Sequence, residues 1–241
     1  MWVVHNKKIM TRPHSLFIYG ITILFLLSAC RYKQKEKNNT EMSEAEEKEY
    51  LADSLLNNIK TQSELYKDWT NAYKEKDTHF SLDSFEYLSE YNDEFLNSSF
   101  TPDKSFYKKY GPLLVYNADS TKFIDLFSYY LVLNINKNGK VSSGGTEADQ
   151  EVAVVDKKTK TRYRVFFCGT PCFVAKASWL DDEKIVLFGL TTEDGDDNYT
   201  PTIWLIDLKT ASTTEYNYNK SINELSPDEL LEKILKSKGI K

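Results

Sequence analysis

The spacing of apolar residues separates a helical region from a β region. From residue 43 onward, apolar side chains recur every three to four positions, which is the period of one face of an α-helix. Ser43 and Glu46 have the spacing of a capping box, so we expect a long helix to begin there. The predicted core-facing stripe of this long N-terminal helix consists of Leu51, Leu55, Ile59, Tyr66, Trp69 and Tyr73.

Two further helices are predicted. Phe85, Leu88 and Phe95 share a helical face, which indicates a second helix over residues 82–96. Near the C-terminus, Ser226 is a typical cap, and the proline that follows it suits the first helical position. We therefore expect a C-terminal helix over residues 226–238, with a glycine at position 239 as its stop.

Between residues 112 and 218 the pattern changes to β. Short segments rich in β-branched and aromatic residues alternate with turn formers, as in antiparallel strands. The predicted strands are Leu113–Tyr116, Phe123–Ile135, Glu151–Asp156, Arg162–Phe167, Phe173–Trp179, Lys184–Leu190, Thr202–Asp207 and Thr213–Tyr218. A glycine- and serine-rich segment at 142–145 is predicted to be a flexible hairpin loop.

The β region contains an internal repeat. Residues 154–159, VVDKKT, match residues 205–210, LIDLKT, and the acidic turns at 117–122 and 180–184 are also alike. The segment TIWLIDLKT at 202–210 resembles the third strand of β-propeller blades. Two four-strand units are too few to close a propeller, so the resemblance implies a pair of sheets or one curled sheet. Ordinary hairpins, whose Asp and Lys-Thr residues only serve turns, are the alternative.

The expected fold class is therefore α+β. It combines an antiparallel β-sheet region of two blade-like four-strand units with a long N-terminal helix, a second helix and a C-terminal helix. The predicted single globular domain covers residues 43–241, of which 43–100 are mainly helical, 112–218 are β and 226–238 are helical.

The first 29 residues have the pattern of a secretory signal. Basic residues precede an apolar stretch at 16–27, which is shorter than the roughly 20 residues needed to span a membrane. The residues Leu27-Ser28-Ala29-Cys30 resemble the lipobox of bacterial lipoproteins. That resemblance implies that residues 1–29 are a signal peptide and that Cys30 carries a diacylglycerol. An uncleaved membrane anchor is the alternative.

Residues 30–42 are densely charged and are predicted to be a lipidated tether. Lipoproteins retained in the inner membrane tend to carry Asp after the cysteine, whereas this chain has Arg31, so the resemblance favours the outer membrane. The membrane, reached through the lipid on Cys30, is thus the first expected partner.

The charge balance argues against nucleic acid as a partner. The signal holds three of the 31 basic residues and none of the 36 acidic ones, so the remainder has a net charge of −8. A binder of polyanions would present a basic face. An envelope protein or a glycan is the expected second partner.

Few residues can carry catalysis after the signal is removed. Only His79 remains of the three histidines, and it lies in a polar segment, so we expect it at the surface. A histidine-rich zinc site is therefore excluded, and the acidic segment 193–198 lacks the pattern of an EF-hand. We predict no catalytic residue, no metal site and no cofactor.

Two groups of residues are candidates for structure or binding. Cys168 and Cys172 flank a short turn, and they are predicted either to form a disulfide or to be two buried thiols. Exposed aromatic side chains can bind a sugar ring or a partner, but in alternating strands many aromatic residues belong to the core instead. The candidate ligand platform consists of Tyr129, Tyr130, Trp179, Trp204 and Tyr216.

These observations favour a membrane-tethered, non-enzymatic binding or interaction module of the bacterial envelope. One alternative is a carboxylate-dependent glycan hydrolase, because the many acidic residues could supply a catalytic pair in space. Another is an accessory subunit of an envelope complex that offers an unpaired strand edge.

Overall fold

The computed structural model describes residues 42–192, 198–223 and 225–241. The predicted signal peptide, Cys30 and nearly all of the predicted tether lie outside these residues. Contacts between Cα atoms separate residues 1–47 from one compact unit formed by residues 48–241. None of the helices in the described ranges is long and apolar enough to cross a membrane.

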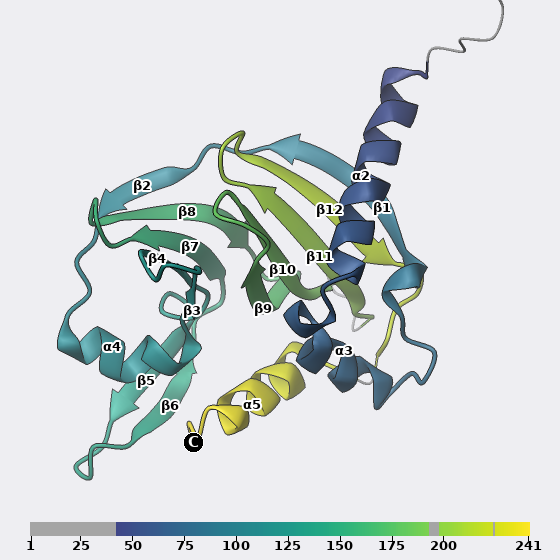
Figure 1. Ribbon diagram of the computed structural model, residues 1–241. Helices are drawn as coiled ribbons and strands as arrows, with labels where there is room; N and C mark the ends of the chain where they lie inside the picture. The colour runs from purple at the N-terminus through teal and green to yellow at the C-terminus, as the bar shows by residue number, and fades with distance from the viewer. Residues whose placement is uncertain (1–41, 193–197, 224) are drawn as a thin grey trace, which may run out of the picture. The chain divides into compact units, whose positions relative to one another are not determined.

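The expected α+β class is confirmed, because helices combine with two five-stranded antiparallel sheets and a separate hairpin (Figure 1). The first sheet runs in the order β1 (Phe85–Asn92), β12 (Ser212–Tyr218), β11 (Thr200–Asp207), β10 (Lys184–Thr191) and β9 (Cys172–Trp179). The second runs in the order β2 (Leu96–Ser99), β8 (Thr161–Cys168), β7 (Gln150–Asp156), β4 (Lys122–Asp125) and β3 (Val115–Tyr116). The hairpin consists of β5 (Leu131–Ile135) and β6 (Val141–Thr146).

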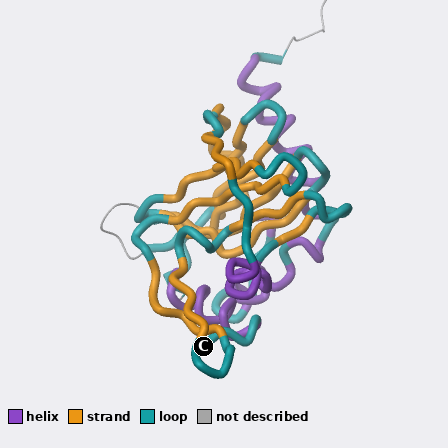
Figure 2. Tube along the Cα trace, turned by 90° about the vertical axis from the view of Figure 1, so that its left-hand side faces the viewer, coloured by secondary structure: helices purple, strands orange, loops and turns teal. Residues whose placement is uncertain are grey.

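The helical elements lie before, between and after the strands. The α-helices are α2 (Glu44–Lys60), α3 (Lys67–Lys74), α4 (Lys104–Tyr110) and α5 (Pro227–Ser237), and the short 3-10 turns are η1 (Ser63–Leu65), η2 (Leu82–Ser84) and η3 (Gly111–Leu113). Figure 2 shows the β5–β6 hairpin projecting from the layered strands toward the C-terminus of the chain. There the Ser143 N–H donates to the Lys241 carbonyl.

The prediction of one long N-terminal helix is wrong, because the helix ends at Lys60 and a second helix begins at Lys67. The Thr61 hydroxyl donates to the Asn58 carbonyl at 2.7 Å, and the Tyr66 hydroxyl donates to the Lys60 carbonyl at 2.9 Å. These bonds satisfy backbone acceptors that a continuing helix would use itself. The capping box at Ser43 is present as predicted.

The buried face of α2 also differs from the predicted stripe. Leu51 is 54% exposed, whereas Ala52, Leu56 and Ile59 are buried against the first sheet. The Tyr216 hydroxyl on β12 donates to the Ala52 carbonyl at 2.7 Å. The helix is therefore rotated about its own axis, so that its buried face is shifted by about one residue from the predicted one.

The predicted second helix over residues 82–96 is wrong. A short 3-10 turn leads into β1, which pairs antiparallel with β12 from Phe85 opposite Tyr218 to Asn92 opposite Ser212. Leu88, one of the three residues on the predicted helical face, lies in a β-bulge and is 56% exposed. The backbone partners that decide between helix and strand here lie more than a hundred residues away.

Most predicted strands in the β region are present, with local corrections. The predicted strand 123–135 is divided into β4 and β5, because the Asp125 carboxylate accepts hydrogen bonds from Ser128 and holds a turn. The predicted loop 142–145 is part of β6, and α4 was not predicted. The C-terminal helix is confirmed with its capping box between Ser226 and Glu229, and Gly239 after it has φ +68°.

The repeated segments occupy equivalent turns, although the described residues form no propeller. Asp156 between β7 and β8 accepts hydrogen bonds from the backbone N–H groups two and three residues further on. Asp207 between β11 and β12 does the same. Lys160 and Ala211, each four residues after its Asp, have φ +56° and +53°. The matching sequences therefore encode the same turn.

Candidate functional site

A groove of about 550 Å³ lies between α3, α5 and the edge strand β9. Its volume is typical of sites that bind small organic molecules. The apolar side chains that line it are Trp69, Ala72, Leu113, Leu114, Val115, Leu126, Phe127, Ala175, Ala177, Leu230 and Ile234. The groove was not predicted from the sequence.

Each flanking helix presents a single face to the groove. On α3, Asp68, Ala72 and Glu75 at its C-cap follow each other at intervals of four and three residues. On α5, Leu230, Ile234 and Lys238 at its C-cap lie four residues apart. Residues at these intervals share one face of a helix. The spacing is visible in the sequence, but it does not reveal that the two helices flank the same strand.

Small side chains form the floor. Ala175, Ala177 and Ser178 of β9 line the groove beneath the helices. The Ser178 hydroxyl donates to the Leu65 carbonyl at 3.1 Å, so its one donor is used within the protein. Side chains of this size leave space that a larger apolar residue would fill.

One wall of the groove is held rigidly. Trp69 is 3% exposed, and its ring lies 5.0 Å from that of Tyr73, 5.6 Å from that of Phe80 and 5.2 Å from that of Phe188. These rings belong to one core cluster that includes residues of α2, α3, α5 and both sheets. Close packing restricts side-chain movement, so this wall is preformed.

Charged residues lie at the rim of the groove. Lys176 pairs with Asp68 at 3.5 Å, and Lys233 pairs with Glu75. Both rim acids are thus neutralised. Lys238 also lines the groove, and no ion pair to it is found in the described part of the chain.

A smaller pocket of about 350 Å³ lies between α2 and the first sheet. Its lining is more polar and includes Lys184 and Asp207, which pair at 3.3 Å. This pocket lacks the apolar floor of the larger groove.

The five residues of the predicted platform do not form one surface. Trp204 is 2% exposed and packs against Phe166, whereas Tyr216 is buried beneath α2. Tyr216 lies opposite Ile203 in the ladder, so Tyr216 and Trp204 point to opposite faces of the first sheet. The prediction of a shared platform that includes Trp204 and Tyr216 is therefore wrong.

The other three platform residues lie at the margins of the core. Tyr129 is 47% exposed, and Tyr130 is partly buried with its ring 5.8 Å from that of Phe173. Trp179 is partly buried, and its indole N–H donates to the Val115 carbonyl at 2.9 Å. Since Val115 lines the groove, Trp179 supports the groove from outside it.

Cys168 and Cys172 are joined by a disulfide in the structure, with their Cα atoms 5.3 Å apart. The bond closes the connection between β8 in the second sheet and β9 in the first. It therefore lies at the crossing from one sheet to the other.

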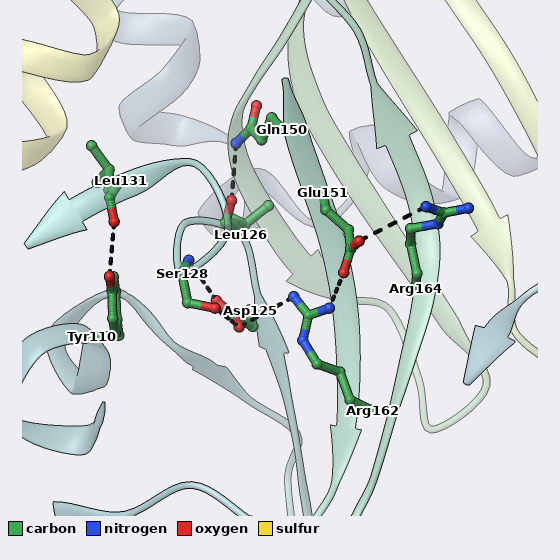
Figure 3. Close-up of polar contacts among 9 residues, drawn as sticks. All are labelled: Tyr110, Asp125, Leu126, Ser128, Leu131, Gln150, Glu151, Arg162 and Arg164. Atoms are coloured by element: carbon green, nitrogen blue, oxygen red, sulfur yellow. Dashed lines mark hydrogen bonds and ion pairs between the residues drawn. The ribbon is translucent and has the colours of Figure 1, made fainter. Parts of the chain in front are cut away.

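Buried charges gather on the second sheet (Figure 3). The Arg162 guanidinium lies between the carboxylates of Asp125, at 3.6 Å, and Glu151. Glu151 also faces Arg164 at 4.0 Å. The Asp125 side chain is 1% exposed and accepts hydrogen bonds from both the backbone and the hydroxyl of Ser128.

This cluster contains the pair of buried carboxylates that a hydrolase would need, but its geometry suits another role. The Arg162 guanidinium lies between the two carboxylates and pairs with each, so it occupies the place that a substrate bond would need. The cluster therefore ties the turn after β4 to β7 and β8.

Few other side chains in the described ranges could act in catalysis or bind a metal. His79 is exposed, as predicted, and its backbone N–H donates to Asp77 at 2.9 Å. No group of three or more His, Cys, Asp or Glu side chains that could hold a metal ion occurs among residues 42–192, 198–223 and 225–241. The acidic segment at 193–197 lies outside them.

Comparison with protein-family models, with curated proteins and with solved structures finds no match to this chain.

Proposed function

We propose that this protein is a lipid-anchored, non-enzymatic binding protein of the bacterial envelope and that its ligand lies in the groove between α3 and α5. The groove is the single observation that carries the proposal. It combines a preformed aromatic wall, an apolar lining and a floor of small residues in a volume suited to a small molecule. Burial of apolar ligand surface there is favourable by roughly 25 cal/mol per Å².

Attachment to the membrane is supported by the sequence. The apolar segment at 16–27 precedes Leu27-Ser28-Ala29-Cys30, in which Cys30 is the residue that would be lipidated. Metabolic labelling with a radioactive fatty acid tests this part of the proposal. Wild-type protein should incorporate label and begin at residue 30, and the Cys30→Ser variant should incorporate none. An unlabelled wild-type chain would refute the lipid anchor and leave the groove untouched.

Ligand binding is tested on the purified full chain with N-phenyl-1-naphthylamine, a neutral apolar probe. Native mass spectrometry should show one probe molecule per chain. Ile234→Gln places a polar group in the groove wall and should weaken binding by about tenfold. Glu232→Gln, on the exposed side of α5, is the matched control and should bind like wild type. Equal binding by the two variants would show that the probe binds elsewhere.

A hydrolase is less well supported than a binding protein, because the buried carboxylates of Asp125 and Glu151 share an arginine. The accessory-subunit alternative would use one of the outermost strands of the sheets, of which β1 is the one within the segment 82–96 that was predicted to be helical. This strand carries a β-bulge at Leu88 and the acidic residues Glu86 and Glu90, features that discourage pairing with another strand. We therefore place the binding surface at the groove.

We also propose that the two strand groups are blade-like copies of one unit. The equivalent turns after Asp156 and Asp207 support this interpretation. Lys160 and Ala211 share a left-handed backbone conformation, in which glycine is favoured. Lys160→Gly and Ala211→Gly should therefore each stabilise the protein by about 1 kcal/mol in urea unfolding. If one substitution stabilised the protein and the other destabilised it, the two turns would not be equivalent.

A further inference from the structure

The groove differs in charge from the rest of the molecule. The chain as a whole has 36 acidic and 31 basic residues. The groove is lined by three lysines, Lys176, Lys233 and Lys238, and by only two acids, Asp68 and Glu75. Its charged lining therefore has the opposite sign from the whole chain.

The distribution of ion pairs isolates one of these lysines. Asp68 and Glu75 are paired with Lys176 and Lys233, so the protein itself neutralises both rim acids. Lys238 lines the groove as the C-cap residue of α5 and is exposed. No ion pair to Lys238 is found among the described residues, so its ammonium group can meet an anion at the mouth of the groove.

Two of the polar side chains that line the groove donate to the protein itself. The Ser178 hydroxyl donates to Leu65, and the Ser237 hydroxyl donates to the Ile234 carbonyl at 2.7 Å. An ammonium group has three donors and no acceptor. The chemistry left for a ligand is thus an apolar surface with a cation, Lys238, and the exposed Asn71 amide among its lining residues.

We propose that the ligand of the groove is an anionic amphiphile, such as a fatty acid, with its apolar chain on the floor formed by β9 and its carboxylate at Lys238. This inference rests on the proposed binding function and names the class of ligand. Apolar contact supplies affinity, and the charge at the rim selects the head group. A neutral amphiphile of the same chain length keeps the apolar contact and loses only the interaction with the charge at the rim.

Competition between two ligands of equal chain length tests the inference. The purified full chain is mixed with equal concentrations of dodecanoate and 1-dodecanol, and native mass spectrometry measures the ratio of the two complexes. Wild type should favour dodecanoate by about threefold, the range expected of a partly exposed ion pair. Lys238→Met should bring the ratio close to one, and Lys238→Arg should keep the preference.

Lys236→Met is the matched control. Lys236 lies in the last turn of the same helix, so its removal should affect the helix dipole much as the removal of Lys238 does. Lys236 does not belong to the groove lining. This variant should keep the wild-type ratio, and thermal unfolding by circular dichroism checks that all variants are folded.

The outcomes separate the two proposals. Equal binding of dodecanoate and dodecanol by wild type would overturn the anionic class but leave the binding function standing. A preference that survives Lys238→Met would also overturn it, because the carboxylate would then lie elsewhere. Binding of neither ligand, together with no binding of N-phenyl-1-naphthylamine, would refute the proposed function itself.

Discussion

The side-chain amide of Gln150 in β7 and the backbone of Val174 in β9 form a reciprocal pair of hydrogen bonds. The Gln150 Nε2 donates to the Val174 carbonyl at 2.9 Å, and the Val174 N–H donates to Gln150 Oε1 at 2.8 Å. The same Nε2 donates to the Leu126 carbonyl at 3.1 Å. Because β7 and β9 belong to different sheets, one buried glutamine joins them.

Replacement of Gln150 by Met should therefore destabilise the protein strongly. The change keeps a side chain of similar length but leaves three buried backbone groups without partners. We expect a loss of about 3 kcal/mol in the free energy of unfolding in urea. Gln62 lies just after α2, is partly exposed, and donates to the Asn58 side chain at 3.3 Å, so Gln62→Met should change it by less than about 0.5 kcal/mol. Similar losses for both would mean that the amide does not join the sheets.

Arg162→Met should also be strongly destabilising, because it removes the cation that lies between the buried carboxylates of Asp125 and Glu151. Breaking a buried ion pair in this way costs about 3 kcal/mol. Arg164 is more exposed and lies 4.0 Å from Glu151, so Arg164→Met should cost less than about 1 kcal/mol. Urea unfolding measures both. A harmless Arg162→Met would show that the carboxylates accommodate each other and would reopen the hydrolase alternative.

Gly189 in β10 is predicted to tolerate no side chain. A Cβ atom there would lie 2.0 Å from the carbonyl oxygen of Phe173 in the neighbouring strand. Gly189→Ala should therefore cost more than about 2 kcal/mol. Gly111 has no atom within 4 Å of its Cβ position and has φ −47°, so Gly111→Ala should be neutral or stabilising by up to about 1 kcal/mol. Thermal unfolding of both variants distinguishes these outcomes.

The disulfide between Cys168 and Cys172 should contribute modestly to stability. It closes a loop with a sequence separation of only 4, so it restricts the unfolded chain little. The double variant Cys168→Ala/Cys172→Ala should lose about 2 kcal/mol. A reducing agent should lower the unfolding midpoint of wild type to about that of the double variant. It should leave the midpoint of the variant unchanged. Sensitivity of the variant to the reducing agent would contradict this assignment.

Glu215 in β12 should make stability depend on pH. Burial raises the pKa of its carboxyl group above the usual value, although the neighbouring Trp204 side chain partly opposes the shift. The folded protein then holds this proton more tightly than the unfolded chain. Its contribution to stability is present below the unfolded-state pKa and is lost as pH rises through the folded-state pKa.

Glu215→Gln removes this titration. Urea unfolding between about pH 4 and pH 8 should show that the variant gains stability relative to wild type as pH rises. The exposed Glu232→Gln on α5 serves as the control and should follow wild type across the range. A constant difference between Glu215→Gln and wild type at every pH would contradict the raised pKa.

The sequence by itself determined the elements whose signals are local. The cap at Ser226 and the stop at Gly239 belong to one helix, and the sequence predicts both. The repeated turns after Asp156 and Asp207 depend on bonds over two or three residues. Such interactions need no distant partner, so a pattern of neighbouring residues is sufficient.

Only the tertiary structure decided the elements whose partners are distant. Residues 85–92 have a helical period but form β1, because β12 supplies their backbone hydrogen bonds. The aromatic residues Trp204 and Tyr216 were candidates for a platform, yet the packing of sheet and helix buries both. The groove arises where α3, β9 and α5 meet, at positions 68, 176 and 238 among others. Burial and contact between distant segments are properties of the folded chain, and a pattern along the chain indicates which residues are apolar but not which of them meet.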